Sequence, residues 1–332
     1  MKFETRRVGR TPLEVTTFGL GGATLAGNMS TVRESDGRML VLDAFDSGVR
    51  YFDTAPFYGY GKSEHVMGDG LRDHAGFVLS TKVGRLLKPR RKPRDPGDAW
   101  QHPLPFEYGF DYSYDGVMRS YEDSLQRLGL ARIDILYIHD VDNYTHGAAV
   151  QPRMFSAAMD GAYKALDELR RTGEVKAIGL GVNEAKPIAD ALSHGQWDCF
   201  LLAGRYTLLE QEPLHSLFPA LEKHGASVVI GGPFNSGILA GRETWNYAKA
   251  PDDVVKRVKA IAEVCDDHKV ALPAAALRFP LAHKVVASII PGPRSAAELN
   301  QIFEWWNAPI PASLWSDLKT ARLIDAAAPV PA

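Results

Sequence analysis

Four side chains that could move a proton lie far apart in the sequence: Asp53, Tyr58, Lys82 and His139. A phenol with an ordinary pKa of about 10 is a poor base at neutral pH, but a nearby ammonium stabilises its phenolate. Lys82 could supply that ammonium, and Asp53 could be its counter-ion. His139 could exchange a hydrogen bond with a substrate oxygen. These residue types predict an acid/base that gives a proton to a carbonyl or takes one from a hydroxyl.

The elements that must position these groups follow a regular alternation. Short apolar runs alternate with longer segments that have the apolar spacing of amphipathic helices. The runs predict strands at Thr17–Gly21, Arg50–Asp53, Phe77–Lys82, Ile133–His139, Val175–Val182, Cys199–Ala203, Ser227–Ile230 and Val285–Ile290. The segments predict helices at Glu34–Ser47, Glu64–Asp73, Gly116–Leu128, Phe155–Arg171, Ala185–His194, Pro213–His224 and Val254–His268. Such alternation predicts a parallel sheet covered by helices, either a closed (β/α) barrel or a doubly wound open sheet. Eight units with no Pro- or Ser-rich linker between halves favour one α/β domain over residues 1–332, a (β/α)8 TIM barrel with a short N-terminal β-hairpin.

Polar residues recur where the predicted strands end. Asp53, Lys82 and His139 each end a strand, and Asn183 follows another. In a TIM barrel the carboxyl ends of the strands form one mouth, where active sites are built. A single polar residue at such a place often only caps a helix, but four strands that deliver polar groups to one rim predict a functional site.

The composition excludes several classes of protein. A chain of 332 residues that is 45% hydrophobic and 23% charged is typical of a globular enzyme. Its net charge of −2 gives no basic field for nucleic acid, and its apolar stretches are too short to span a bilayer. The N-terminus has no signal-peptide core, and Cys199 and Cys265 form no CxxC pair. We therefore expect a cytoplasmic protein that binds a small molecule rather than nucleic acid or membrane. The sequence leaves the oligomeric state open.

The longest connection between predicted elements runs from about residue 84 to 115. It opens with a basic run at residues 85–94 and continues with aromatic residues. Long connections without regular structure are usually functional in compact domains. The basic run could be a solvated face, or the connection could be a lid that walls a substrate pocket beside Lys82. The candidate pocket residues are Phe57, Tyr60, Trp100 and Phe106.

Reduction of a carbonyl, or its reverse, also requires a hydride carrier, so a cofactor is expected. The stretch Gly19–Thr24 lacks the third glycine of a Rossmann fingerprint and is a weak signal. Residues 289–299 are a better anion site, because a strand leads there through a Pro-Gly-Pro turn into a helix start beside Arg294. Ser236 and Gly237, after the seventh strand, would complete a phosphate site. The alternative is an ordinary helix start capped by Ser295.

Five motifs, in order over nearly the whole chain, closely resemble those of the aldo-keto reductase superfamily: FDTAPFYGYGKSE, LSTKVG, DILYIHD, AIGLGVN and IIPGPRS. The resemblance implies a (β/α)8 barrel with an extended nicotinamide dinucleotide across its mouth. It implies a catalytic tetrad at Asp53, Tyr58, Lys82 and His139, with Tyr58 as the proton donor or acceptor. It also implies that Asn183 holds the nicotinamide carboxamide. The other expected cofactor contacts are Gly22, Phe234, Ser236, Gly237, Leu239, Pro291, Gly292, Arg294 and Glu298.

Departures from the superfamily pattern bear on the cofactor. Gly231 stands where many members have a tyrosine that stacks on the nicotinamide, and Phe234 could replace that contact. Gly292 and Glu298 stand where NADP-preferring members carry a lysine and an arginine for the 2′-phosphate. A carboxylate repels that phosphate and accepts hydrogen bonds from a free ribose. This favours NAD, although Arg294 keeps NADP possible.

Residues 201–211 and 228–241 resemble a bacterial branch of the superfamily that oxidises sugars at the anomeric carbon, the D-threo-aldose 1-dehydrogenases or L-fucose dehydrogenases. That branch implies NAD-dependent oxidation of an aldose, or a similar cyclic hemiacetal, to its lactone, with Tyr58 as the base. The alternatives are a pyridoxal 4-dehydrogenase, an NADPH-dependent carbonyl reductase and a nucleotide-binding regulatory subunit.

An acidic and imidazole cluster after the fourth predicted strand raises one further alternative, a metal hydrolase. Its members are His139, Asp140, Asp142 and His146. Their spacing matches no standard zinc pattern, and His139 already belongs to the proton-transfer group. The sequence therefore predicts no metal.

Overall fold

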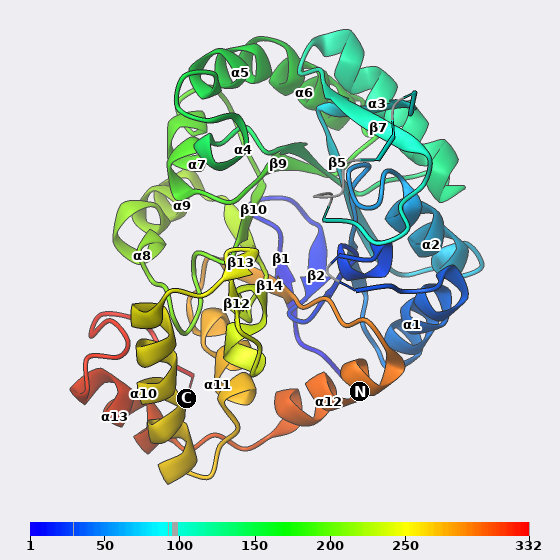
Figure 1. Cartoon of the computed structure of the whole chain (residues 1–332). Coiled ribbons are helices and arrows are strands. Elements are labelled where there is room, and N and C mark those ends of the chain that lie inside the picture. The colour runs from blue at the N-terminus through cyan, green and yellow to red at the C-terminus, as the bar shows by residue number, and fades with distance from the viewer. Residues whose placement is uncertain (29, 92, 95–98, 332) are drawn as a thin grey trace.

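A computed structural model describes residues 1–28, 30–91, 93–94 and 99–331. Parallel strands occupy its centre and helices surround them (Figure 1). The sheet order is β3-β4-β5-β8-β9-β10-β11-β14, in which neighbours along the chain pair in parallel. The strands are β3 (Leu20–Gly21), β4 (Tyr51–Asp53), β5 (Val78–Val83), β8 (Ile135–His139), β9 (Ala177–Val182), β10 (Cys199–Ala203), β11 (Ser227–Gly231) and β14 (Val286–Ile290).

The sheet closes on itself beside β3 and β14. Phe18 and Ile289 form a parallel bridge. The Gly19 N–H donates to the Ile289 carbonyl at 2.8 Å, and the Ile289 N–H donates to the Thr17 carbonyl at 3.0 Å. Nearly every strand residue is buried, as expected where helices cover one face and the barrel interior the other. The predicted (β/α)8 barrel is confirmed.

The helices cover the outside of the barrel. They are α1 (Glu34–Asp46), α2 (Lys62–Leu71), α3 (Tyr114–Leu128), α4 (Asn143–His146), α5 (Gln151–Ala157), α6 (Tyr163–Thr172), α7 (Ala185–Ala191), α8 (Pro213–Ser216), α9 (Phe218–His224), α10 (Asp252–Asp267), α11 (Leu272–Arg278), α12 (Ala296–Asn307) and α13 (Ala312–Thr320). The helix predicted at 155–171 is α5 and α6 joined by a π-helical turn, Ala158–Ala162. The helix predicted at 213–224 is broken at Leu217.

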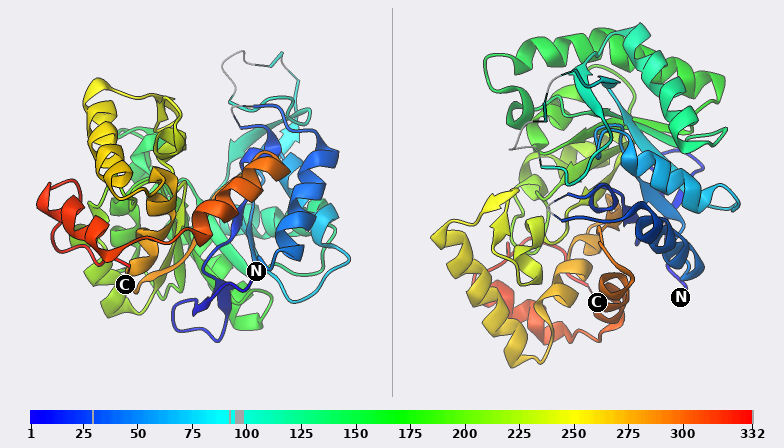
Figure 2. Two further views of the ribbon diagram at one scale, coloured as in Figure 1. Left: turned by 90° about the horizontal axis from the view of Figure 1, so that it is seen from below. Right: turned by 45° about the vertical axis from the view of Figure 1, so that its right-hand side comes forward.

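The N-terminal hairpin closes one end of the barrel. Its strands β1 (Thr5–Arg7) and β2 (Glu14–Thr16) are antiparallel. Val8, Leu13 and Val15 are buried in one cluster with residues of the barrel interior such as Tyr51 and Tyr137. The hairpin lies at the opposite end of the molecule from the long connection after β5 (Figure 2, left). A functional site can therefore open only at the other end of the barrel.

The connection predicted as a structureless lid is partly ordered. Strands β6 (Arg85–Pro89) and β7 (Phe106–Phe110) pair antiparallel along their full length. Part of the predicted lid and of the basic run, residues 92 and 95–98, lies outside the described residues. A second hairpin, β12 (Thr244–Trp245) and β13 (Ala248–Lys249), follows β11. Among the described residues, no helix has the length and apolar character needed to cross a bilayer.

Candidate active site

The barrel brings the four predicted proton-transfer residues together. Lys82 Nζ donates to Asp53 Oδ2 at 2.7 Å and to the Thr54 carbonyl at 2.9 Å. The same ammonium lies over the face of the Tyr58 ring, 4.7 Å from its centroid. The ring of His139 stands edge-on to that of Tyr58, with 5.9 Å between centroids. One basic, one acidic, one phenolic and one imidazole group therefore share the barrel mouth.

Tyr58 is held by the tight turn that connects β4 to α2. Its N–H donates to the Ala55 carbonyl at 3.1 Å, and its carbonyl accepts from the Ser63 N–H at 3.2 Å. The Ser63 hydroxyl donates to the Gly22 carbonyl at 2.7 Å and so ties the turn to the end of β3. Gly61 has a φ of 98°, which an L side chain rarely adopts, so glycine is required at this point. The turn fixes the phenol over Lys82.

Burial controls the charges of these groups. Burial raises the pKa of Tyr58 well above its usual value; the Asp53 and Asp140 charges add to the shift and Arg85 opposes it. Burial, with the nearby cations Arg85 and Lys82, lowers the pKa of His139 well below its usual value. At neutral pH, Tyr58 therefore holds its proton and His139 is a neutral imidazole. The cluster is ready to donate hydrogen bonds to an oxygen.

A second buried ion pair lies beside this cluster. Arg85 Nη2 donates a short hydrogen bond to Asp140 Oδ2. The Arg85 guanidinium lies over the Phe57 ring at 3.9 Å and over the Tyr108 and Phe110 rings at 4.7 Å each. From the sequence, Asp140 was considered only as a ligand in the metal-hydrolase alternative, and Arg85 was not singled out. Their positions could have indicated a role, because Arg85 follows the motif that contains Lys82 and Asp140 follows His139.

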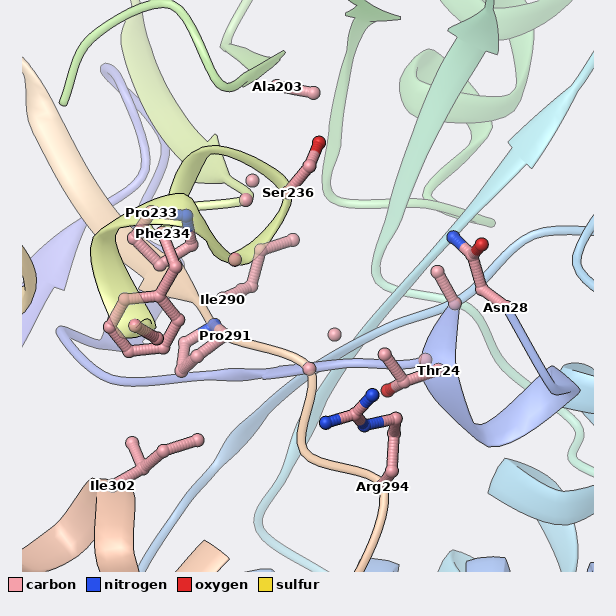
Figure 3. A pocket seen from close by; sticks show the side chains of 18 of the residues that line it. Thr24, Asn28, Ala203, Pro233, Phe234, Ser236, Ile290, Pro291, Arg294 and Ile302 are labelled. Atoms are coloured by element: carbon pink, nitrogen blue, oxygen red, sulfur yellow. The ribbon is translucent and has the colours of Figure 1, made fainter. Parts of the chain in front are cut away.

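A cavity of about 310 Å³ opens next to Tyr58 and Asp53, bounded by the ends of β3, β11 and β14 and the start of α12. Figure 3 shows Thr24 and Arg294 on one side of it and Pro233 and Phe234 on the other. Gly232, with a φ of 57°, leaves the cavity wall open where a side chain would stand. Eight of the predicted cofactor residues line the cavity: Gly22, Phe234, Ser236, Gly237, Pro291, Gly292, Arg294 and Glu298. A cavity lined by glycines, with an arginine at a helix start, suits the phosphates of a dinucleotide.

The two remaining cofactor predictions lie elsewhere. Leu239 is fully buried in the main core, and its N–H already donates to the Phe234 carbonyl at 3.2 Å. Asn183 lies beside the ion pair, where its Nδ2 donates to Asp140 Oδ1 at 3.3 Å. Phe234 lines the cavity near α12, where its ring stands edge-on to that of Trp305 with 6.0 Å between centroids. That Phe234 takes the place of the tyrosine that stacks on the nicotinamide stays a prediction.

Glu298 is not the free carboxylate that the sequence argument assumed. Its Oε2 accepts from the Arg294 backbone N–H at 2.9 Å and from Arg294 Nε at 3.1 Å. Its Oε1 accepts from Arg242 Nη2 at 3.2 Å. The N-cap Ser295 accepts from the Glu298 N–H at 3.2 Å, so the helix start is also capped as the alternative interpretation expected. Glu298 thus neutralises two arginines at the edge of the cavity.

The four predicted substrate-pocket aromatics do gather around Tyr58. Phe57, Tyr60, Trp100 and Phe106 belong to one small apolar cluster with Tyr58. The Trp100 ring lies 5.3 Å from that of Phe57 and 5.6 Å from that of Tyr58, measured between centroids. They form a wall on the long-connection side of the site.

Sequence reasoning missed Tyr247, which lines the cavity from the β12–β13 turn. Asn246 and Tyr247 have φ values of 47° and 63°, the conformation of a two-residue type I′ turn in which the second residue is normally glycine. The Tyr247 N–H donates to Ser236 Oγ at 3.0 Å, and Arg205 Nη1 donates to Asn246 Oδ1 at 2.7 Å. A tyrosine in this strained position has no sequence signal except the missing glycine.

The metal alternative finds no support in the geometry. Asp142 caps α4 by accepting from the Thr145 N–H at 3.0 Å, and His146 Nε2 lies 3.1 Å from the Tyr112 hydroxyl. Across the part of the chain that the structure describes, no three His, Cys, Asp or Glu side chains are grouped so as to hold a metal ion.

Comparison with known proteins agrees with this geometry. The model of the aldo/keto reductase family matches residues 17–322. The chain belongs to the aldo/keto reductase family. As a member of this family it is an oxidoreductase that uses a nicotinamide cofactor. The resemblance seen in the sequence motifs is therefore confirmed.

Two relatives extend over almost the whole aldo/keto reductase chain. It is 44% identical to the pyridoxal 4-dehydrogenase of Microbacterium luteolum, over 97% of this chain and 98% of the relative. It is 37% identical to a D-threo-aldose 1-dehydrogenase of a Pseudomonas species, over 94% of this chain and 95% of the relative. The holo form of a Bacillus halodurans aldo-keto reductase has the same fold, with a TM-score of 0.76, 24% identity and coverage of 98% and 97%.

Proposed function

We propose that this aldo/keto reductase oxidises a cyclic hemiacetal to its lactone with NAD, and that an aldose is the substrate class. The observation that carries the proposal is the Tyr58 phenol, which has the Lys82 ammonium over its ring and the His139 ring edge-on to it, and which lines the cavity. The relatives named for D-threo-aldose and pyridoxal support it, because both compounds form cyclic hemiacetals. The 44% identity makes pyridoxal the second candidate substrate.

The chain's own residues supply the proton path. His139, a neutral imidazole, donates a hydrogen bond to the hydroxyl oxygen on the carbon to be oxidised. In the oxidation Tyr58 must act as the phenolate: it first releases the proton that its raised pKa holds in the site without cofactor, and its Oη then removes the proton from that hydroxyl. Lys82 and Arg85 are the cations that stabilise the phenolate. A nicotinamide cofactor, when bound, would supply the acceptor for the hydrogen of that carbon as hydride. The balance is hemiacetal and oxidised cofactor giving lactone, reduced cofactor and one proton.

The preference for NAD is proposed from Glu298. Its carboxylate holds Arg294 and Arg242, the two cations at the edge of the cavity that would otherwise attract a 2′-phosphate. We expect Glu298→Ala to free both arginines and to lower the Kd for NADP relative to that for NAD by about tenfold. Glu304→Ala, on the exposed side of the same helix, is the matched control. Titration of both cofactors against intrinsic fluorescence measures the ratio, and an unchanged ratio in Glu298→Ala contradicts the role of Glu298.

The substrate is tested by a panel assay. NADH formation is followed with L-fucose, D-arabinose and pyridoxal, each with NAD and with NADP. Turnover of the sugars with NAD supports the aldose proposal, and turnover of pyridoxal alone selects the second candidate. Reduction of aldehydes by NADPH without oxidation of any hemiacetal would show a carbonyl reductase instead. Cofactor binding without turnover of any carbonyl or hemiacetal would show a regulatory subunit.

A further inference from the structure

Asp140 directly follows His139 at the end of β8, and its backbone is unusual. Its φ of 52° lies in the left-handed region, which is a strained conformation for an L residue. Its N–H donates to the Gly181 carbonyl at 2.9 Å, and its carbonyl accepts from the Tyr112 hydroxyl at 3.0 Å. The strained residue is therefore fixed on both sides by hydrogen bonds. Such strain is typical of a side chain that must be aimed at a particular place.

The carboxylate of Asp140 is buried together with Arg85. Asp140 is 7% exposed and Arg85 is 4% exposed. Taking two charges out of water costs several kcal/mol each, and apolar residues of similar size would often stabilise a fold as well or better. Three aromatic rings cover the guanidinium, so the pair is held rigidly. Its cost indicates a role beyond folding, and the proton path does not use the Asp140 carboxylate.

The Asp140 carboxylate lies close to His139, which binds the substrate oxygen in the proposed reaction. Asp140 Oδ2 lies 3.3 Å from Nε2 of His139. Asp140 Oδ1 accepts from Asn183 Nδ2 at 3.3 Å. Burial is the main cause of the raised pKa values of Tyr58 and Tyr247, and the nearby negative charge of Asp140 adds to both shifts. A carboxylate has about four acceptor positions, and these contacts leave room for one more donor.

Oxygens on adjacent carbons lie roughly one hydrogen-bond length apart. When the reacting oxygen is on His139, an oxygen on the neighbouring carbon therefore comes within reach of Asp140. Aldoses carry a hydroxyl there, on C2. In pyridoxal the nearest ring hydroxyl is one carbon further away, because the aldehyde carbon is bonded to ring C4 and the hydroxyl is on ring C3. Only the aldose therefore carries a hydroxyl on the carbon next to the reacting one.

We propose that Asp140, backed by Arg85, is a substrate-binding residue that accepts a hydrogen bond from the hydroxyl on the carbon next to the one oxidised. The inference rests on the proposed hemiacetal oxidation. Arg85 is a positioning residue: it keeps Asp140 ionised and in place, and the rings of Phe57, Tyr108 and Phe110 fix it in turn. The pair selects 2-hydroxy hemiacetals against analogues that lack this group.

The test compares substrates that differ only in that hydroxyl. We expect kcat/KM to fall by about 10- to 100-fold from L-fucose to 2-deoxy-L-fucose, the range for one hydrogen bond to a charged acceptor. In Asp140→Asn this ratio should shrink to a few-fold, with most of the loss falling on the hydroxylated substrate. Glu107→Gln, on the exposed part of the hairpin that carries Arg85, should keep the wild-type ratio.

Removing one member of a buried ion pair leaves the other charge unpaired and can unfold a protein. The double variant Arg85→Met/Asp140→Asn removes both charges and is tested in parallel. It should fold and should also lose the discrimination. No turnover of any hemiacetal, with or without the hydroxyl, would reject the proposed function itself. Turnover in which the wild type does not discriminate, or in which the folded variants still do, would overturn the Asp140 inference alone.

Discussion

Two groups of buried charges in this barrel differ in how completely they are satisfied. The mouth group contains the pairs Asp53–Lys82 and Arg85–Asp140. The structural group contains Glu64 of α2 with Arg127, and Asp134 at the start of β8 with Arg132 and Lys176.

In the structural group, every carboxylate oxygen has a partner within the protein. Glu64 Oε1 accepts from Thr81 Oγ1 at 2.7 Å, and its Oε2 accepts from Arg127 Nε at 2.5 Å. Asp134 Oδ2 accepts from the Leu79 N–H at 2.9 Å, and its Oδ1 lies 3.0 Å from Lys176 Nζ. These charges join helix to strand and strand to strand.

In the mouth group, Arg85 Nε and the adjacent His139 Nδ1 are buried without a hydrogen-bond partner among the described residues. Buried polar atoms are nearly always paired unless a site has another use for them. If the Asp140 proposal holds, the same kind of interaction, a buried ion pair, serves the fold in one place and a ligand in the other. Substitutions in the two groups should therefore give opposite results, and this can be tested.

The largest effect is expected at Tyr58. Tyr58→Phe removes only the hydroxyl that carries the proton, so turnover should fall by about 10³-fold or more while the Kd for the cofactor stays within a few-fold. Steady-state kinetics and fluorescence titration measure the two quantities. Activity near that of the wild type would remove Tyr58 from the proton path.

A substitution in the structural group should lower the stability of the protein and leave its catalytic rate unchanged. Glu64→Ala leaves Arg127 without its buried partner and should lower the free energy of unfolding by about 3–5 kcal/mol. At urea concentrations below the unfolding transition, the kcat of Glu64→Ala should match that of the wild type. Urea unfolding followed by circular dichroism measures the first quantity, and a stable but inactive Glu64→Ala protein would place Glu64 with the mouth group.

The pH dependence of kcat/KM should show an acid limb from Asp140. Burial raises the pKa of Asp140 to about 6, the nearby Asp142 adds to the shift, and Arg85 and Lys82 oppose it. As the pH falls through 6, Asp140 gains a proton and loses its value as an acceptor, so kcat/KM for a 2-hydroxy hemiacetal should fall. Asp140→Asn should lack this limb.

The same shift has the opposite sign for stability. The unfolded carboxyl has a pKa of about 3.9, so between roughly pH 4 and 6 the folded state binds more protons than the unfolded state. The contribution of Asp140 to stability therefore decreases as the pH rises through this window.

An acid limb of kcat/KM that persists in Asp140→Asn would assign that limb to a group other than Asp140.

The smallest effect is expected at the β12–β13 turn. Tyr247→Gly restores the residue type that a type I′ turn favours and should stabilise the protein by about 1 kcal/mol. It also removes a side chain from the cavity wall, so the KM of the substrate should rise. Thermal unfolding and KM are measured on the same preparation, and a stabilised variant with an unchanged KM would show that Tyr247 does not contact the substrate.

The barrel strands could be predicted from the sequence, because the pattern of apolar residues within each short segment determines them. The apolar runs located all the barrel strands because each is buried on both sides, and the polar residues at their ends located Asp53, Lys82 and His139. The hairpin β6–β7 was missed, because its residues are partly exposed and show no clear alternation. The helix break at Leu217 has a local cause, Pro219 in the first turn of α9, which the apolar periodicity does not show. The strain at Tyr247 depends on contacts between distant segments. For the same reason the sequence could not show that Glu298 is paired with Arg242, which lies 56 residues away.

The hairpin β1–β2 has a practical consequence, because it plugs the amino end of the barrel. In the proposed reaction, dinucleotide, substrate and product would therefore enter and leave at the other end. The first residues of the chain lie toward the hairpin end, where the Met1 amino group donates to the Ser47 carbonyl at 2.8 Å (Figure 2). A tether or carrier domain attached ahead of Met1 would leave the end with the site clear. Immobilisation on a surface through this terminus should therefore preserve catalysis.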